Sequence, residues 1–347
     1  MITKQALIAA AKAAQAANPA RPLLAAALGA VGAQLESSDP PWWQAASAAW
    51  PQRHFDTADE ALLLIWAAMH DQALSGHALG AELPSCFGTP TGKLADAVTR
   101  FLQAPPTEFI LSLTTRLYRR HASYWASRWV EPARLFFSRR ELPFYLLELR
   151  SCGGLGACAD LITPRKKKKS FDSELVEARV ALDDAILDLR KDSDAKWLIA
   201  CCGPDDIAGI KDAARWTRRL RGLLEADAAV VQGASCALAL TPAFVAKNIP
   251  VAEDSGLLIF SSRFAASLPA GPRETASLAM AQALRPWGDR ALWVDIERSK
   301  ADAWTEELHV GRGREKGFSW HCFSRTQTTA AASQSAADDA KNAAFLS

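Results

Sequence analysis

An acidic residue followed by several glycines, at the end of an apolar run, is the part of this sequence best suited to chemistry. The run FYLLEL at residues 144–149 carries Glu148 near its end, and Gly153, Gly154 and Gly156 follow it. Glycines let a backbone approach a ligand closely, and a helix that comes next presents free amide groups at its positive end. The stretch therefore predicts a turn that holds a nucleotide-like ligand at the carboxyl end of a strand.

The spacing of these residues separates two classes of nucleotide site. It does not match G-x-G-x-x-G, which excludes the dinucleotide-binding fingerprint. It is closer to the E-x-G-x-G-x-G pattern of class I methyltransferases, where Glu148 and Gly154 match but Arg150 and Cys152 replace the first two glycines. A side chain at the first glycine position takes up space where the backbone must turn tightly under the ligand. The pattern therefore also allows a degenerate site.

The second part of the chain contains the elements that must position this turn. Continuous apolar runs predict five strands: FYLLEL (144–149), WLIACC (197–202), AAVV (228–231), LLIF (257–260) and LWVDI (292–296). Helical patterns lie between them at 211–224 and 272–284, and residues 308–323 are expected to form a final hairpin. Continuous runs are typical of strands that helices cover on both faces. We therefore predict an α/β fold with a mainly parallel sheet.

The first part of the chain is predicted to be helical. The clearest helix follows Asp59, which is expected to cap its first turn, and Gly76 suits the left-handed conformation just past its end. Further helices are expected at 93–103 and 109–129, and the alanine-rich stretch 1–17 predicts a surface helix rather than a secretory signal. The predicted domains are a helical N-terminal cap (1–140), an α/β domain (141–325) and a disordered tail (326–347).

Charge and hydropathy exclude several kinds of partner. Forty basic and 38 acidic residues give a net charge of +2, so no whole-molecule field is expected to capture nucleic acid or an anionic membrane. No apolar run reaches the roughly 18 residues that span a bilayer. The basic run 165–169 could bind an anion, but it is more typical of a solvated loop. The remaining expectation is a small-molecule ligand, with the oligomeric state left open.

Cysteine and histidine spacing predicts no metal site. Seven cysteines, an odd number and mostly within apolar runs, indicate reduced thiols in a cytoplasmic protein. Zinc motifs on a helix need histidines four residues apart, whereas His70 and His77 are separated by Gly76. We interpret His70 as a histidine packed inside the helical block, with a general base as the alternative. Ser235 stands in an incomplete G-x-S-x-G motif and gives weak support for a hydrolase.

Several segments together resemble an uncharacterised bacterial family, domain of unknown function 2332, whose core is methyltransferase-like. The similarity runs through four segments: residues 62–85, the glycine-rich stretch 146–156, residues 182–205 and LWVDIE at 292–297. It extends over roughly residues 20 to 325. Ala234 stands near the position where the family tends to have an acidic turn.

The resemblance implies a Rossmann-type, methyltransferase-like domain that binds S-adenosylmethionine. Glu148, Gly153, Gly154 and Gly156 would form the loop under this cofactor, and Asp183 or Asp184 would accept hydrogen bonds from its ribose hydroxyls. The two aspartates could instead cap the next helix. The expected function is an S-adenosylmethionine-dependent methyltransferase. The alternative is a non-catalytic scaffold or binding protein that keeps the fold.

Overall fold

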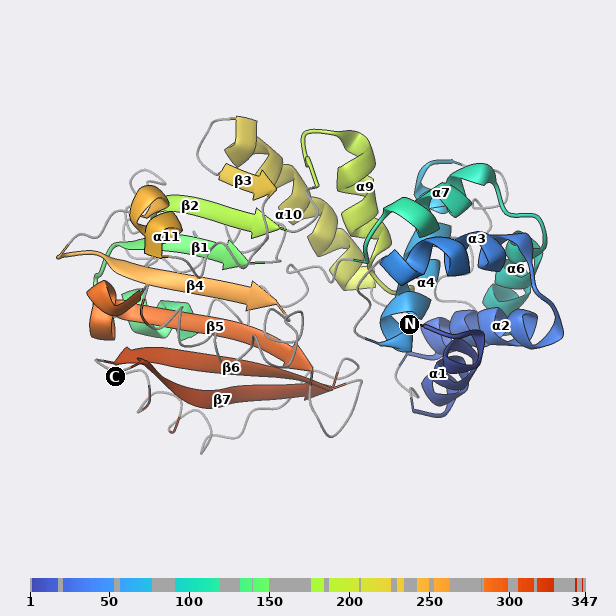
Figure 1. The fold of residues 1–347 in the computed structure, drawn as a ribbon, viewed down its shortest axis with the longest axis horizontal. Coiled ribbons are helices and arrows are strands. Elements are labelled where there is room, and N and C mark those ends of the chain that lie inside the picture. The colour runs from blue at the N-terminus through green and yellow to red at the C-terminus, as the bar shows by residue number, and fades with distance from the viewer. Residues whose placement is uncertain are drawn as a thin grey trace. The chain divides into compact units, whose positions relative to one another are not determined.

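The computed structural model describes the chain as two compact units (Figure 1). The described residues are 2–17, 21–52, 57–76, 91–118, 132–138, 140–149, 176–183, 187–205, 207–225, 230–233, 242–249, 253–262, 282, 284–298, 305–314, 317–327, 341 and 345. Unit 1 comprises Met1–His121 and Lys191–Ala214, and unit 2 comprises Ala122–Arg190 and Arg215–Ser347. Among the described helices, none combines the length and apolar character that a membrane-spanning segment requires.

Unit 1 is a bundle of helices around aromatic side chains. Its described helices are α1 (Lys4–Ala17), α2 (Pro22–Ser37), α3 (Pro41–Ala49), η1 (Trp50–Gln52), α4 (Ala58–Leu74), α6 (Thr91–Gln103), α7 (Thr107–Thr115), α9 (Asp192–Ala200) and the start of α10 (Ile207–Glu225). Fully buried Trp42, Trp66, Trp197, Phe101 and Phe109 fill its core. The all-helical character predicted for the first part of the chain is confirmed for the described residues.

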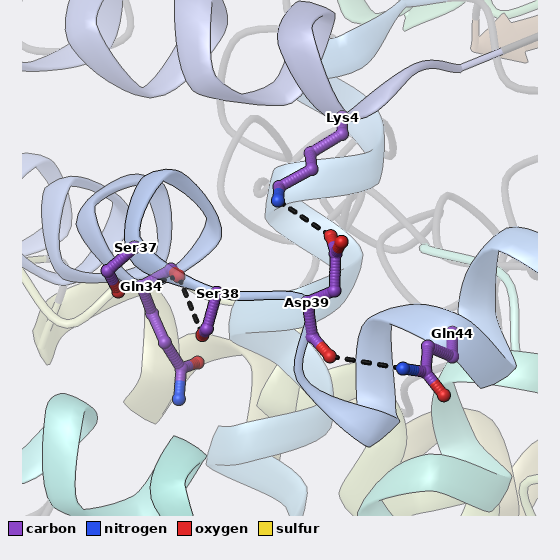
Figure 2. A network of polar contacts seen from close by, with 6 residues as sticks. All are labelled: Lys4, Gln34, Ser37, Ser38, Asp39 and Gln44. Carbon is purple, nitrogen blue, oxygen red and sulfur yellow. Dashed lines mark hydrogen bonds and ion pairs between the residues drawn. The ribbon is translucent and has the colours of Figure 1, made fainter.

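Polar contacts join the first three helices at the surface of unit 1 (Figure 2). Lys4 Nζ lies 2.6 Å from Asp39 Oδ1, and Gln44 Nε2 donates to the Asp39 carbonyl at 3.2 Å. The Ser38 amide and hydroxyl both donate to the Gln34 carbonyl, which ends α2. Because the Asp39 side chain is 66% exposed, its ion pair with Lys4 adds little to stability.

Two helix boundaries differ from the sequence prediction. The cap of α4 is Thr57, whose hydroxyl accepts from the Glu60 amide, whereas Asp59 lies within the first turn. Gly76 has φ +78°, as predicted for the residue that follows the helix. The helix expected at 109–129 ends at Thr115, where Arg116 turns extended and its guanidinium pairs with Asp194. The helix therefore ends at residue 115, and residues 119–129 of the predicted helix lie outside the described residues.

The prediction of a strand at WLIACC (197–202) is wrong. Residues 197–200 form the end of α9, and Cys201 and Cys202 follow it as a turn. Asp192 and Asp194 in the first turn favour a helix, because negative charge is stabilising near a helix N-terminus. A short continuous apolar run suits a buried helix as well as a strand, and only its flanks distinguish the two.

Unit 2 contains one sheet of seven strands in the order β3-β2-β1-β4-β5-β6-β7 (Figure 1). The strands are β1 (Phe144–Leu149), β2 (Val176–Asp183), β3 (Val230–Gly233), β4 (Gly256–Ser262), β5 (Ala291–Arg298), β6 (Thr305–Arg314) and β7 (Gly317–Gln327). The first five are parallel, while β6 runs antiparallel to β5 and β7 antiparallel to β6. A mixed, mostly parallel open sheet with helices confirms the predicted α/β class.

One face of this sheet carries the main described core of unit 2. The cluster joins side chains of β1, β2, β4 and β5 to Val245 and Ile249 of α11 (Pro242–Asn248) and its end, and to Trp287 of η6 (Arg285–Arg290). On the opposite face, the Phe137 ring from the short turn Arg134–Ser138 stacks on Phe144 with centroids 4.3 Å apart. Both faces of the central strands are therefore covered, as the continuous apolar runs predicted.

The predicted final hairpin is confirmed and is longer than expected. Strand β7 continues to Gln327, past the start proposed for the tail at 326. Gly311 and Gly313 lie inside β6, near its turn. A side chain at Gly313 would have its Cβ 2.0 Å from the Gly288 carbonyl oxygen, so this position requires glycine for close approach of two backbones.

Candidate ligand site at the carboxyl ends of the parallel strands

The strand order of unit 2 reverses beside β1. The chain passes from β1 to β2 and β3 on one side, and then returns to β4 on the other side of β1. In open α/β sheets, ligands bind outside the carboxyl ends of the strands at such a reversal, because the connections on either side diverge and leave a crevice. The carboxyl ends of β1 and β4 are therefore where a ligand of this unit is expected.

Glu148 lies at this end of β1. It is the penultimate residue of the strand, is in register with Ala181 and Phe260, and is 2% exposed. Its neighbours Leu147 and Leu149 belong to the core cluster, so strand alternation directs Glu148 to the opposite face. A carboxyl group buried to this degree needs polar partners, because burial without them costs several kcal/mol.

Asp183 ends the neighbouring strand at the same edge. It is the last residue of β2 and is in register with Gly233, the last residue of β3, while Leu182 before it pairs with Leu149. The next described helix, α9, begins only at Asp192 and has Lys191 as its N-cap. Asp183 is therefore a strand-end residue, and the alternative of a cap for that helix is wrong.

Other predicted positions lie outside the described residues. These are Gly153, Gly154, Gly156 and Asp184 of the predicted cofactor site, the substitutions Arg150, Cys152 and Ala234, Ser235, and the basic run 165–169. Of the predicted cofactor-binding residues, the structure thus brings Glu148 and Asp183 to one edge of the sheet. Strand β1 ends at Leu149, where the sequence predicted the start of the turn.

A buried polar cluster that the sequence did not predict joins β4 and β5. The Ser261 hydroxyl donates to Asp295 Oδ1, and the Trp293 indole Nε1 donates to Ser261 Oγ at 2.8 Å. Ser261 is fully buried and Asp295 nearly so. Because Ser261 is in register with Leu149, this cluster lies on the face opposite to Glu148. Its signal in the sequence is Ser261 directly after the run LLIF and Asp295 inside the run LWVDI.

His70 has a structural role in unit 1, as predicted. It is 1% exposed within α4, and its Nδ1 lies 3.1 Å from the Ala200 carbonyl oxygen. Burial lowers the pKa of His70 to about 4, which keeps the imidazole neutral. Its neighbour Asp71 has a raised pKa for the same reason, because burial disfavours the charged carboxylate.

Comparison with known proteins gives one match. A family described as an uncharacterized protein conserved in bacteria (DUF2332) matches residues 156–330, just over half of the chain. The match includes β2 to β7 and begins after Glu148, Gly153 and Gly154. No curated protein and no solved structure shows a significant match.

Proposed function

We propose a function for this chain from the chemistry of unit 2. The chain belongs to the DUF2332 family of uncharacterized bacterial proteins, and that description gives no activity. The α/β unit binds S-adenosylmethionine at the carboxyl ends of β1 and β2 and acts as an S-adenosylmethionine-dependent methyltransferase with a Rossmann-type sheet. The observation that carries the proposal is the pair of acidic residues, Glu148 and Asp183, at the ends of adjacent strands next to the reversal of strand order.

The strand order supports a nucleoside ligand. Doubly wound sheets that bind nucleotides have the order 3-2-1-4-5, with the ligand beside strand 1 and an acidic residue after strand 2 that accepts from the ribose hydroxyls. The described sheet has this order from β3 to β5, and Asp183 ends β2. An ionised carboxylate can accept hydrogen bonds from both ribose hydroxyls, and charged acceptors make the stronger bonds.

The two acids fit S-adenosylmethionine better than they fit a nucleoside phosphate. Phosphate groups are repelled by carboxylates, whereas this cofactor carries a cationic sulfonium and an ammonium group. Glu148 and Asp183 are two acidic residues near the ends of strands that are hydrogen-bonded neighbours, about 5 Å apart. The two acidic residues at the described edge therefore suit a cationic nucleoside.

Catalysis by this arrangement rests on positioning. When bound, S-adenosylmethionine supplies a methyl group that passes from its sulfonium to an electron-rich acceptor atom, and the acceptor loses a proton. The chain contributes by holding the ribose through Asp183 and by fixing the start of the glycine-rich turn through the buried end of β1. Orientation of two reactants can lower a barrier by about 7–11 kcal/mol, so no catalytic triad is required.

Isothermal titration of the full chain with S-adenosylmethionine tests the proposal. We expect saturable binding of one ligand per chain, and Asp183→Asn should weaken the affinity about tenfold to a hundredfold through loss of the charged acceptor. Asp254→Asn is the matched control, because Asp254 is an exposed aspartate just before β4, at the amino edge of the same sheet.

Two outcomes would contradict the proposal. If titration releases no heat and millimolar S-adenosylmethionine gives no thermal shift, the non-catalytic scaffold is favoured. That alternative is motivated by Arg150, Cys152 and Ala234, which replace the residues expected in a methyltransferase site. An equal loss of affinity in the Asp183 and Asp254 variants would remove the role given to the end of β2.

A further inference from the structure

Three side chains of types that commonly bind metals lie close together on the outer hairpin of unit 2. Glu307 and His309 are two residues apart in β6, so they share a face of the sheet, and Cys322 of β7 is the register partner of His309. His309 Nε2 lies 3.0 Å from Glu307 Oε2, and one ligand atom from each of the three residues lies within 4.8 Å of the others. They are the group of this kind found among the described residues.

A register shift in the hairpin creates this meeting. Up to Leu308, which pairs with Ser324, the strands pair without interruption, but His309 then pairs with Cys322. Without the shift, Phe323 would stand opposite His309 and Cys322 opposite Val310, on the other face. A β-bulge of this type re-aims a side chain, and bulges are frequent next to functional sites. The irregularity therefore brings the thiol to the imidazole and the carboxylate.

The three residues are accessible without being fully exposed. The His309 side chain is 31% exposed and that of Glu307 15%. Cys322 is partly buried, in contrast to the buried thiols of Cys201 and Cys202. An ion can reach the group from solvent, and the partly excluded water strengthens its electrostatic interactions.

We propose that Glu307, His309 and Cys322 form a binding site for a divalent cation of the Zn²⁺ class. Thiolate, imidazole and carboxylate together suit Zn²⁺, whereas Mg²⁺ and Ca²⁺ prefer sets made only of oxygen. Metal–ligand bonds of 2.0–2.3 Å in a tetrahedral site separate the ligand atoms by about 3.3–3.8 Å. The described atoms reach this geometry through side-chain movements of roughly 1 Å.

The chemistry of binding balances within the group. The Cys322 thiol releases its proton to water as the sulfur–metal bond forms, and His309 donates a lone pair from a neutral ring nitrogen. Glu307 contributes a carboxylate oxygen. Three protein ligands leave a fourth position for water or another small molecule, which is the arrangement of open zinc sites.

A carboxylate stands beside the histidine on the neighbouring strand. Asp295 of β5 is directly opposite His309 in the antiparallel pair, and its Oδ1 accepts from the buried Ser261 hydroxyl. Carboxylates beside metal-ligating histidines fix the ring orientation and increase its basicity. Ser261, Asp295, His309 and Cys322 therefore form one continuous row across β4, β5, β6 and β7.

The test is metal binding by the purified full chain, with Zn²⁺ in competition against a chromophoric chelator and Co²⁺ as a spectroscopic probe. We expect one ion per chain and an absorption band from thiolate-to-cobalt charge transfer. Cys322→Ser should abolish the band, and His309→Gln should lower the Zn²⁺ affinity at least about a hundredfold. His321→Gln is the matched control, because His321 is adjacent to Cys322 in β7 but pairs with Val310.

A second readout does not depend on these variants folding well. Zn²⁺ should slow alkylation of Cys322 by iodoacetamide in the wild-type chain, as located by mass spectrometry. The proposal is overturned if Cys322 is alkylated at the same rate with and without Zn²⁺. It is also overturned if wild type, Cys322→Ser and His321→Gln bind the ion equally, which would assign the binding to other residues.

Discussion

The two units use their polar side chains in different ways. In unit 1 two buried tryptophans bond to the main chain: Trp66 Nε1 donates to the Cys202 carbonyl at 2.9 Å, and Trp197 Nε1 donates to the Leu117 carbonyl at 2.9 Å. In unit 2 polar side chains within the sheet contact one another, as Ser261 does with Asp295 and His309 with Glu307. Most side-chain hydrogen bonds in proteins go to the backbone or water, so the second pattern is the less common one.

This difference teaches where to look for chemistry. A buried indole that bonds to a main-chain carbonyl fixes the packing of the helices around it. Carboxylates, a hydroxyl and an imidazole grouped on neighbouring strands present groups that a ligand can use. Substitutions in the two units are therefore expected to affect stability in different ways.

The largest expected effect is the pH dependence that His70 gives to unit 1. Its pKa of about 4 in the folded chain lies below the ordinary 6.5, so the unfolded chain takes up a proton first as the pH falls. This contribution to stability is fully present above about pH 6.5 and is lost as the pH falls to about 4. A difference of 6.5 against about 4 corresponds to about 3 kcal/mol.

Urea denaturation of wild type and His70→Asn between pH 7 and pH 4 measures this effect. The asparagine retains a donor for the Ala200 carbonyl but does not titrate, so the variant should lose about 3 kcal/mol less than wild type over this range. The raised pKa of Asp71 acts in the opposite direction, and it is common to both proteins. Identical pH dependence in the two proteins would contradict a buried, neutral His70.

The next effect concerns a carboxylate that binds the main chain in unit 1. Asp205 accepts from the Leu23 amide at 3.0 Å and from the Leu24 amide at 2.8 Å, at the start of α2. These amides have no partner within the helix. Asp205→Ala should therefore lower the free energy of unfolding by about 2 kcal/mol. In the control, Glu36→Gln removes the exposed pair with Lys12 and should cost less than about 0.5 kcal/mol.

A smaller effect is expected from the polar cluster of unit 2. Ser261→Ala removes the hydroxyl between Trp293 and Asp295 and should cost about 1 kcal/mol in chemical denaturation. Ser47→Ala is the matched control, since Ser47 of α3 is only partly buried and its hydroxyl donates to the Gln44 carbonyl within the same helix. A Ser261 variant as stable as wild type would mean that the row across the strands does not hold the sheet together.

The fold was predictable where a run of residues has one physical reading. Strands β1, β4 and β5 and the helix at 211–224 were predicted because their apolar patterns are long or bounded by breakers. Strand β2 was not predicted, since Glu177 and Arg179 interrupt its apolar residues. The apolar pattern at the end of α9 suits a strand as well as a helix. The pattern of α7 continues past Thr115, where the described helix ends and Arg116 pairs with Asp194 far along the chain.

The candidate sites divide in the same way. Glu148 could be identified from a local motif, and Asp183 from its place in a family resemblance. The Glu307, His309 and Cys322 group could not, because no zinc motif has this spacing and the residues meet only through a shifted strand register. Sequence patterns indicate sites built within one segment, whereas sites built across strands require the pairing to be known.

Hydrogen–deuterium exchange with and without saturating S-adenosylmethionine tests the central claim most directly, because it reads both units in one experiment. Slower exchange is predicted at the carboxyl ends of β1 and β2, in peptides covering 144–149 and 176–183, with no change in α4 of unit 1. Unchanged exchange in both strands, or protection confined to the helices of unit 1, would contradict a nucleoside site at this edge of the sheet.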